Sequence, residues 1–386
     1  MEIFLRKAKF GMKIYRYTEF KSNPFGHGAE KRTAQISEIL REAGYDFEII
    51  KRNDINKINP SRIILKSLSH FIFIQKILNF NTFKNLRIIL RFVYRSIITE
   101  VFFSKIFNEN NKLLIWEFTR SDCFFIPGLA RKMKLYTIGI PHNIESLVPN
   151  QCSSISGKKS PDWFNEEIKY LSFCDLVFCI SKEDTNLLSL FGINAFYLPY
   201  YPVLEVERAL FKIRKKRTEK INENKRRKIL MLGSADNQPT RLGMIDRISF
   251  FNRSKGIDFK ILIAGFNTEI LSELVEESSE IRILGTLNSE ELDSLLIEVD
   301  YILIHQPPTS GSLTRIPEML IAGLPVILNF TSARNYFNMD GIYTYNCDEE
   351  LLELLKSDLK KIPDLPVKPE KEVKIFKQKI RSINLC

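Results

Sequence analysis

The sequence lacks the features that mark secreted, metal-binding or membrane-spanning chains. Its six cysteines form no Cys-x-x-Cys pair and no Cys/His spacing that suggests zinc, and no Asp-x-Asp motif offers a metal site. No uncharged apolar run approaches the ~20 residues that span a bilayer. We therefore expect reduced thiols in a cytoplasmic protein that needs no metal.

The amino terminus lacks the apolar core of a signal peptide, because Arg6, Lys7 and Lys9 interrupt it. We expect Met12 to be the natural start and the residues before it to be a short extension. The 386 residues are 44% apolar and 27% charged, which suits one or two domains with full cores.

Acidic residues are too few to balance the basic ones, and the formal net charge of +11 is unevenly spread. Between Ser61 and Phe107, eight Lys and Arg residues and many aromatic residues are opposed by Glu100 alone. This combination suits an anionic membrane surface or a phosphate-bearing substrate. A helical pair packed on a sheet, with solvated charges, is the alternative. Nucleic-acid binding is not favoured, because no recognition motif accompanies the charge.

The first half alternates between strand-like apolar runs and helical patterns. Lys13–Tyr17 is expected to be a strand, followed by a glycine-containing loop and a helix that ends at Gly44. A helical block is expected at 63–107, with breaks near Asn79–Asn81. Further strands are expected at 47–50, 113–116, 135–140, 176–180 and 195–198. The alternation predicts a parallel sheet of the α/β class.

The second half repeats this alternation after a very basic stretch. Strands are expected at 229–232, 259–263, 281–284, 301–304 and 326–328, with helices at 289–298, around Glu318 and at 370–383. We therefore expect one domain at 1–207 and a second domain at 229–370. The stretch 208–228 is expected to be an exposed basic linker, and the terminal helix within 371–386 is expected to pack back on the first domain.

The segment Thr309–Ile327, TSGSLTRIPEMLIAGLPVI, has the pattern of a strand-to-helix turn that binds a diphosphate. Free backbone N–H groups and the helix dipole favour an anion at such a helix start. Gly311 lets the backbone approach a ligand closely, and Arg315 adds a positive charge that does not titrate. Glu318, one turn into the helix, is placed to accept hydrogen bonds from a ribose diol.

From Ile281 to Ile327 the sequence resembles the C-terminal domain of family 4 type retaining glycosyltransferases. The shared pattern is a glycine after a strand, a helix, a second strand, a glycine-containing loop, a glutamate, and then Ala-Gly and Pro-Val. Here these positions are Gly285, Gly311, Glu318, Ala322, Gly323, Pro325 and Val326. The resemblance implies the GT-B architecture, in which two Rossmann-like, doubly wound domains face an interdomain cleft. It also implies that the domain at 1–207 binds the acceptor and that the domain at 229–370 binds the nucleotide sugar. It also implies retention of anomeric configuration and no metal requirement.

Weaker matches lie in the first half, in the PHNIES segment at 141–146 and the ISKED segment at 180–184. In this family type a histidine at the position of His142 lies near the donor sugar and phosphate. The resemblance therefore implies catalytic roles for His142 and Glu318. Asn143 and Glu145 are expected to help shape the site.

The glycine loop after the first strand, Gly26-His27-Gly28, resembles part of a dinucleotide fingerprint, but a third glycine is missing. We expect this loop to let a donor phosphate or an acceptor approach the backbone. An ordinary strand-to-helix turn is the alternative.

The expected donor site combines the motif with the start of the second domain. In related enzymes that start supplies a cation to the diphosphate, and Arg241 is the candidate here, with a surface role as the alternative. The full set for nucleotide and phosphate is Gly233, Ser234, Arg241, Ser310, Gly311, Ser312, Leu313, Thr314, Arg315 and Glu318. Many members have a second glutamate eight positions before Glu318, where this sequence has Ser310, and that departure leaves the donor sugar open.

These patterns predict a glycosyltransferase that moves a sugar from a UDP- or GDP-linked donor to a glycan or lipid-linked acceptor. Synthesis of cell-surface polysaccharide, at the inner face of the cell membrane, is the expected setting. Ser310 motivates one alternative, a non-catalytic partner subunit that binds a nucleotide sugar. A GT-B epimerase that acts on the nucleotide sugar itself is the other.

Overall fold

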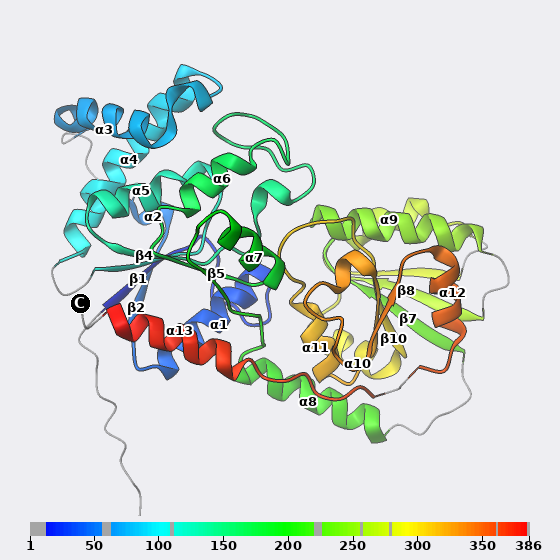
Figure 1. The fold of residues 1–386 in the computed structure, drawn as a ribbon. Coiled ribbons are helices and arrows are strands. Elements are labelled where there is room, and N and C mark those ends of the chain that lie inside the picture. Colours follow the sequence, from blue (N-terminus) through cyan, green and yellow to red (C-terminus); the bar gives the residue numbers. More distant parts are fainter. Residues whose placement is uncertain are drawn as a thin grey trace, which may run out of the picture. The chain divides into compact units, whose positions relative to one another are not determined.

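The computed structural model describes residues 13–55, 63–108, 112–219, 226–254, 258–277, 280–359 and 362–383. The expectations for Met12 and the residues before it, for 61–62 and for 220–225 therefore lie outside the described residues. The chain forms two compact units (Figure 1). The first comprises 1–200, 310–312 and 369–386, and the second comprises 201–309 and 313–368.

In its described part, the first unit contains a six-stranded sheet in the order β2-β1-β3-β4-β5-β6. Every neighbouring pair is parallel. The strands are β1 (Lys13–Tyr17), β2 (Asp46–Ile50), β3 (Leu113–Trp116), β4 (Tyr136–Gly139), β5 (Leu176–Cys179) and β6 (Ala195–Tyr197). The predicted parallel α/β class is confirmed, because each expected apolar run became a strand.

Helices cover both faces of this sheet, and its central strands β1, β3, β4 and β5 are buried almost throughout. The helices are α1 (Gly28–Glu42), α2 (Arg52–Ile55), α3 (Ile63–Leu78), α4 (Leu86–Ile106), α5 (Phe125–Lys132), α6 (Phe164–Leu171), α7 (Lys182–Leu190) and α13 (Glu370–Ile383). On one face, Ile14 and Ile115 pack with Ile36 of α1 and Phe376 of α13. On the other, Trp116 packs in a second core with residues of α3, α4 and α5.

The helical block of the first unit is a pair of contacting helices, α3 and α4, joined through residues 79–85. The expected break is present: Asn79 has a φ of 47°, and Asn85 caps α4 by accepting a hydrogen bond of 3.1 Å from the Ile88 N–H. One face of α4 packs in the core while Leu86, Leu90 and Tyr94 are exposed. This block is therefore packed on the sheet, with part of its surface left uncovered.

In its described part, the second unit also holds six parallel strands, in the order β12-β11-β10-β7-β8-β9. They are β7 (Arg227–Leu232), β8 (Phe259–Ala264), β9 (Ile281–Gly285), β10 (Tyr301–Ile304), β11 (Val326–Asn329) and β12 (Ile342–Tyr345). The edge strand β12 was not expected. It has only four residues, IYTY, and the partly exposed Tyr343 and Thr344 interrupt the apolar run that marks the other strands. The other five strands lie where the apolar runs predicted them.

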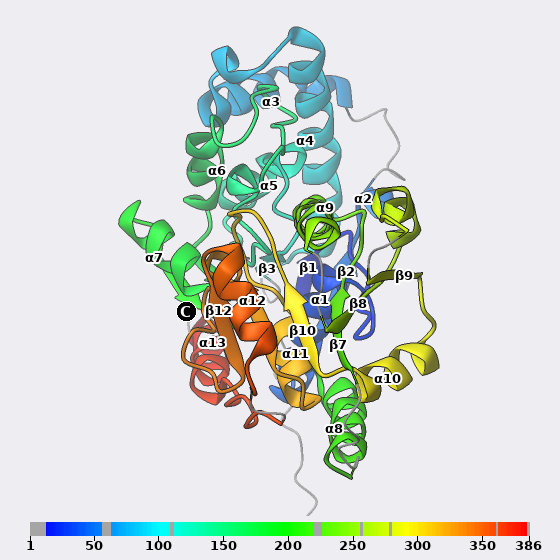
Figure 2. The same cartoon turned by 90° about the vertical axis from the view of Figure 1, so that its right-hand side faces the viewer.

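The helices of the second unit are α8 (Leu204–Glu219), α9 (Gln238–Arg253), α10 (Ser289–Glu298), α11 (Arg315–Ile321) and α12 (Asp348–Lys356). Met244 of α9 and Leu351 of α12 pack with Ile229 on one face of the sheet. Figure 2 shows α8, α10 and α11 on the opposite face. Short 3-10 helices complete the described elements: η2 (Phe80–Thr82), η3 (Ser121–Cys123), η4 (Glu145–Leu147), η5 (Thr268–Leu274) and η6 (Phe330–Ala333).

Helix α8 differs from the exposed linker expected at 208–228. Its apolar residues Val206, Leu210 and Ile213 recur at helical spacing and are buried. Arg217 donates hydrogen bonds to the carbonyl oxygens of Leu296 and Val299 at 2.7 and 2.6 Å, and to that of Gly323 at 3.1 Å. These carbonyls end α10 and follow α11, so the basic residue satisfies acceptors that have no partner within their own helices. Part of the basic composition therefore serves helix capping.

Candidate functional site

The chain order of the two sheets identifies where ligands bind in folds of this kind. In a doubly wound sheet the crossovers run in opposite directions on either side of a switch point, and ligands bind beyond the carboxyl ends of the strands there. The switch point lies between β1 and β3 in the first unit and between β7 and β10 in the second. The loops that follow these strands are therefore the candidate sites.

In the first unit, the loop after β1 and the loop after β4 meet at Phe20. The Phe20 ring centroid lies 5.7 Å from that of His27 and 5.1 Å from that of His142, both in edge-on geometry. His27 precedes α1 and has an exposed side chain, and Gly28 is the first residue of that helix. At Gly26, an added Cβ would collide with the carboxylate of Glu30. The structure thus brings together predicted residues of both loops through Phe20, which the sequence analysis did not single out.

His142 is held in its neutral form. Burial lowers the pKa of the His142 imidazole to about 3, and the cations Arg32 and Arg16 add to the effect. Its Nε2 is buried and has no hydrogen-bond partner among the described residues. A neutral imidazole with an unused nitrogen can donate to or accept from a ligand hydroxyl or phosphate.

Two buried arginines that the sequence analysis missed underlie this region. Arg16 of β1 donates from Nε to Glu117 Oε1 at 2.6 Å and from Nη1 to Ser37 Oγ at 2.6 Å. Arg32 of α1 donates to the Leu198 and Pro199 carbonyl oxygens at 2.5 and 3.2 Å. Burial lowers the pKa of Arg32 to about 10, so it stays charged at neutral pH. The first unit therefore has a positive potential beside His142.

The PHNIES segment is fixed by a buried carboxyl group. Glu167 of α6 accepts hydrogen bonds from the backbone N–H groups of Glu145 and Ser146 at 2.9 and 2.7 Å. Burial raises the pKa of Glu167 to about 8, and burial also raises the pKa of Glu145. Asn143 Nδ2 donates to Glu145 Oε1 at 3.4 Å. Asn143 and Glu145 thus contact each other in the segment that directly follows His142.

Residues 310–312 belong to the first unit, and their backbone is already engaged there. Asp184 Oδ2 accepts a hydrogen bond of 3.0 Å from the Gly311 N–H, and its carboxylate also accepts from the Ser310 hydroxyl at 3.2 Å. The Ser310 hydroxyl accepts a hydrogen bond of 2.6 Å from the Ile144 N–H. Helix α11 begins only at Arg315 and has seven residues. The Gly311 N–H, which the sequence pattern placed at an anion-binding helix start, thus donates to a carboxylate of the protein in this structure.

In the second unit, glycines end three neighbouring strands. Gly265 has a φ of +133°, and a Cβ there would collide with the Gly233 carbonyl oxygen. The Gly233 N–H donates to Ala264 O at 3.0 Å, and the Gly265 N–H donates to Gly285 O at 2.9 Å. The loops after β7, β8 and β9 therefore pack backbone against backbone, and only glycine permits that approach at Gly265.

Arg315 joins this glycine cluster. Its Nη1 donates a hydrogen bond of 2.7 Å to the Leu232 carbonyl oxygen, and a Cβ at Gly233 would collide with the guanidinium. Burial lowers the pKa of Arg315 to about 10, which leaves it cationic at neutral pH, and its Nε is buried without a partner among the described residues. The predicted residues Gly233 and Arg315 are thus adjacent, and the Arg315 Nε–H remains available to donate a hydrogen bond.

Two further predicted donor residues, Ser234 and Arg241, lie between β7 and the first turn of α9 in the second unit. Asn237 caps α9 by accepting a hydrogen bond of 3.2 Å from the Thr240 N–H, and Arg241 lies in the first turn that follows. The Arg241 side chain makes no hydrogen bond or ion pair within the described residues. The Ser234 hydroxyl accepts from the Asp236 N–H at 3.2 Å.

The predicted donor residues at and near the start of α11 have buried or partly buried side chains. The Leu313 carbonyl accepts a hydrogen bond of 3.2 Å from the Tyr336 hydroxyl. Thr314 precedes α11 without a side-chain capping bond, and Glu318 is 4% exposed. Ser312, in the first unit, is partly buried. Across the part of the chain that is described, no three His, Cys, Asp or Glu side chains gather as a metal site would require.

Comparisons with known proteins find similarity in structure alone. No family model and no curated protein matches the sequence. A UDP-forming α,α-trehalose-phosphate synthase from Burkholderia xenovorans, solved with glucose-6-phosphate, matches with a TM-score of 0.61 and 12% identity over 97% of this chain and 100% of that one. A sucrose-phosphate synthase from Thermosynechococcus elongatus matches with a TM-score of 0.56 and 11% identity over 89% of each chain.

A third match is the structure of an enzyme whose name denotes a different reaction. The UDP-GlcNAc 2-epimerase from Methanocaldococcus jannaschii matches with a TM-score of 0.52 and 14% identity over 96% of this chain and 99% of that one. At such identities the likeness establishes fold and not activity. Together with the two parallel sheets and their helices, these matches show that the chain has the GT-B fold, built from two Rossmann-like α/β domains.

Proposed function

We propose that the protein is a glycosyltransferase that uses a nucleotide-sugar donor. The observation that carries the proposal is the cluster of Gly233, Gly265 and Arg315 beyond the carboxyl ends of β7 and β8. Bare backbone beside a buried cation with an unused N–H is suited to a diphosphate. Solved proteins of the same fold include UDP-forming transferases, which supports this choice of ligand.

In this proposal the leaving nucleotide diphosphate is stabilised by fixed cations. Arg315 and Arg241 lie in the second unit, one beside Gly233 and the other in the first turn of α9. Such preorganised charges act on the negative charge that develops in the transition state, without a metal ion. The donor is then a UDP- or GDP-sugar, and the configuration of its anomeric carbon is retained.

Glu318 is assigned to the ribose diol. Because its side chain is 4% exposed, a ribose contact requires neighbouring segments to move when the nucleotide binds. Loop or domain closure of that kind is common in enzymes that exclude water from their reaction. His142 is assigned to the donor sugar and phosphate, where its unused Nε2 provides a neutral hydrogen-bonding group.

Nucleotide titration with a matched pair of variants tests the donor site. Arg241 lies in the first turn of α9 and Arg253 is the last residue of the same helix. We expect UDP or GDP to stabilise the wild type against heat, Arg241→Ala to weaken nucleotide affinity about tenfold, and Arg253→Ala to leave it unchanged. Absence of stabilisation by every nucleoside diphosphate would refute the proposal.

Product analysis separates transfer from the alternatives. The epimerase of the same fold motivates one of them, and such an enzyme would convert the nucleotide sugar without any added acceptor. A non-catalytic partner subunit would bind the nucleotide sugar without releasing nucleoside diphosphate from it. A transferase instead releases nucleoside diphosphate in proportion to the acceptor consumed, which is the expected result of a screen across UDP- and GDP-sugars.

The acceptor is proposed to be a glycan or a lipid-linked molecule at the inner face of the cell membrane, in cell-surface polysaccharide synthesis. The exposed side of α4 carries Leu86, Leu90 and Tyr94, which are 62%, 54% and 47% exposed, together with Arg87 and Arg91. Apolar and basic side chains on one helix face suit an anionic leaflet, where each cation adds about 1 kcal/mol. No helix in the described part of the chain has the length and apolarity of a membrane span.

Vesicle sedimentation tests this membrane contact. The double variant Leu86→Ser/Leu90→Ser should lose binding to vesicles that contain anionic lipid, while wild type binds them and ignores zwitterionic ones. Leu190→Ser on α7 is the matched control, because Leu190 is 83% exposed in the same unit. Equal binding by the double variant and the control would rule out α4 as the contact surface.

A further inference from the structure

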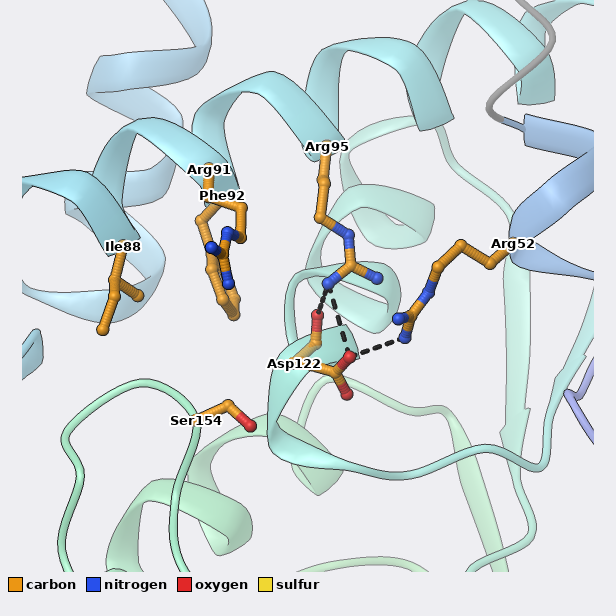
Figure 3. Close-up of a pocket in the computed structure, with 7 residues that line it drawn as sticks. All are labelled: Arg52, Ile88, Arg91, Phe92, Arg95, Asp122 and Ser154. Atoms are coloured by element: carbon orange, nitrogen blue, oxygen red, sulfur yellow. Dashed lines mark hydrogen bonds and ion pairs between the residues drawn. The ribbon is translucent and has the colours of Figure 1, made fainter.

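An arginine-lined pocket in the first unit has no part in the donor site. Its volume is about 290 Å³ and it is lined by Arg52, Ile88, Arg91, Phe92, Arg95, Asp122 and Ser154. Figure 3 shows Arg91 and Arg95 extending from α4 and Arg52 extending from α2 toward the same space. Three guanidinium groups and one carboxylate thus line the pocket.

One carboxylate cannot neutralise the three guanidinium groups. Asp122 Oδ2 lies 2.6 Å from Arg52 Nη2 and 3.4 Å from Arg95 Nη1. Arg91 has no ion pair within the described residues, so the pocket carries two more positive charges than negative ones. The Nε of Arg52 is buried without a partner among those residues. An unused guanidinium donor beside a surplus of charge favours an anionic ligand.

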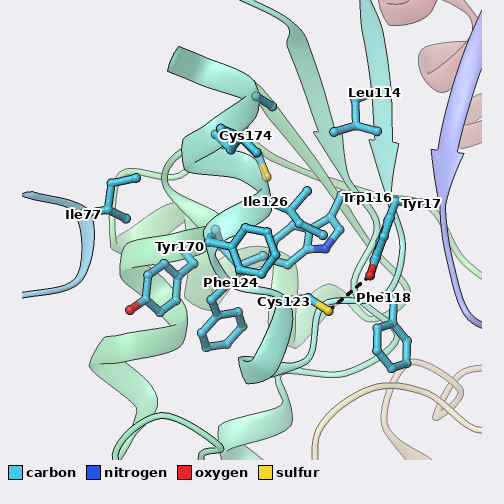
Figure 4. Packing of buried hydrophobic residues seen from close by; sticks show 14 of the residues in the cluster. Tyr17, Ile77, Leu114, Trp116, Phe118, Cys123, Phe124, Ile126, Tyr170 and Cys174 are labelled. Atoms are coloured by element: carbon cyan, nitrogen blue, oxygen red, sulfur yellow. Dashed lines mark hydrogen bonds between the residues drawn. The ribbon is translucent and has the colours of Figure 1, made fainter. Parts of the chain in front are cut away.

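The pocket is built on rigid supports. Arg52 Nη2 and Arg95 Nη2 lie 3.4 and 3.6 Å from the Cys123 sulfur, which the Tyr17 hydroxyl contacts at 3.5 Å. Figure 4 shows this Tyr17–Cys123 contact within the buried core. Opposite the arginines, the Ser154 N–H donates to the Ser121 hydroxyl at 2.8 Å and so fixes the loop that carries Ser154. Arg52 and Arg95 are therefore held in place before any ligand arrives.

Its position in the fold points to the acceptor. Arg52 follows β2 and Asp122 lies in the loop after β3, so the pocket opens at the same carboxyl edge of the sheet as Phe20 and His142. The apolar side chains Ile88 and Phe92 line it as well, and they suit the ring of a sugar or the first carbons of a lipid chain. Arg91 also belongs to the exposed apolar and basic side of α4.

We propose that this pocket binds the phosphate group of a phosphorylated acceptor, either a sugar phosphate or a lipid phosphate. The inference rests on the proposed transferase function and names the class of its acceptor. A phosphate accepts paired hydrogen bonds from guanidinium groups, and the excess of two positive charges matches its dianionic form.

A pair of variants one turn apart on α4 tests the proposal. Arg91 lines the pocket, whereas Arg87 is exposed on the same helix and does not line it. In calorimetric titrations with glucose 6-phosphate, we expect Arg91→Ala to weaken binding about tenfold or more and Arg87→Ala to match wild type. A second arm uses phosphatidylcholine vesicles that contain either phosphatidic acid, a phosphomonoester, or phosphatidylserine.

The two arms identify the source of the phosphate. Arg91-dependent binding of the sugar phosphate assigns a soluble acceptor, and Arg91-dependent preference for phosphatidic acid over phosphatidylserine assigns a lipid acceptor. Equal affinity of Arg91→Ala and wild type in both arms overturns the proposal. UDP titration of the same proteins separates failure of this proposal from failure of the proposed function. If UDP binds normally but Arg91→Ala binds the phosphate ligands as wild type does, only the phosphate pocket is refuted. If wild type binds no nucleotide, the proposed transferase function is refuted.

Discussion

The Phe20 ring stands edge-on to the His142 ring at a centroid distance of 5.1 Å and an interplanar angle of 71°. Such aromatic pairs contribute about 0.5–1.5 kcal/mol beyond their buried area. Phe20 contacts His27 and Phe118 as well, so it joins the loops after β1, β3 and β4. The orientation of His142 therefore depends on a residue that bears no chemistry of its own.

Phe20→Ala should lower kcat for sugar transfer about tenfold, because the imidazole loses its edge-on support. Nucleotide affinity should fall by a smaller factor than kcat, since Arg241, Arg315 and Glu318, which carry the other proposed nucleotide contacts, lie in the second unit. Phe20→Leu keeps an apolar side chain, so its kcat should lie between those of wild type and Phe20→Ala. Steady-state kinetics with a UDP titration would decide, and an unaltered kcat in Phe20→Ala would remove Phe20 from the site.

The free energy of unfolding should fall as pH is lowered from about 6.5 to 3. Burial lowers the pKa of His142 to about 3 in the folded chain, below its ordinary value of about 6.5, so over this window the unfolded state binds the additional proton. One such group contributes a slope of up to about 1.4 kcal/mol per pH unit. Denaturant titrations of wild type and His142→Asn should differ by this slope, and parallel pH profiles would contradict the neutral assignment.

Gly265→Ala should destabilise the second unit by about 3 kcal/mol and abolish nucleotide binding, because the new methyl group collides with the Gly233 carbonyl oxygen. Gly192 provides the comparison: it has a φ of +76°, but nothing lies within 4 Å of its added Cβ. Gly192→Ala should cost only the backbone strain, about 1 kcal/mol. Chemical denaturation of both variants measures the difference, and equal losses would show that crowding at Gly233 is not the cause.

Arg217→Met should destabilise the second unit by about 3 kcal/mol, since the carbonyls at the ends of α10 and α11 lose their donor. Lys215→Ala is the control on the same helix. Lys215 is highly exposed, and its ion pair with Glu219 spans 3.9 Å, so its loss should change stability by less than about 0.5 kcal/mol. Melting curves that shift equally for both variants would argue against capping by Arg217.

The sequence predicted the strands well because their signal is local. Buried parallel strands are short apolar runs bounded by polar residues, and those from Leu113 to Trp116 and from Tyr301 to Ile304 were identified to the residue. Helix α8 was missed for the opposite reason: its basic residues dominate the composition, while its buried residues recur only once per turn. The acceptors that Arg217 satisfies lie roughly 80 to 106 residues away in sequence.

The site was less predictable because its contacts join distant segments. The loops that hold His27 and His142 were each singled out, but nothing local in the sequence shows that Phe20 connects them. Arg16 gave no signal either, since its partner Glu117 is 101 residues away. At Gly311, the local pattern indicated a free N–H, whereas Asp184 in the first turn of α7 accepts a hydrogen bond from it.

The contact between Gly233 and Gly265 has a consequence for how this protein can be mapped by mutation. Substitutions that remove atoms, as in an alanine scan of larger residues, leave a surface of bare main chain untouched. Only substitutions that add atoms report on it, and there the smallest addition already collides with the neighbouring strand end. A scan by truncation would therefore pass over the part of the second unit to which we assign the diphosphate.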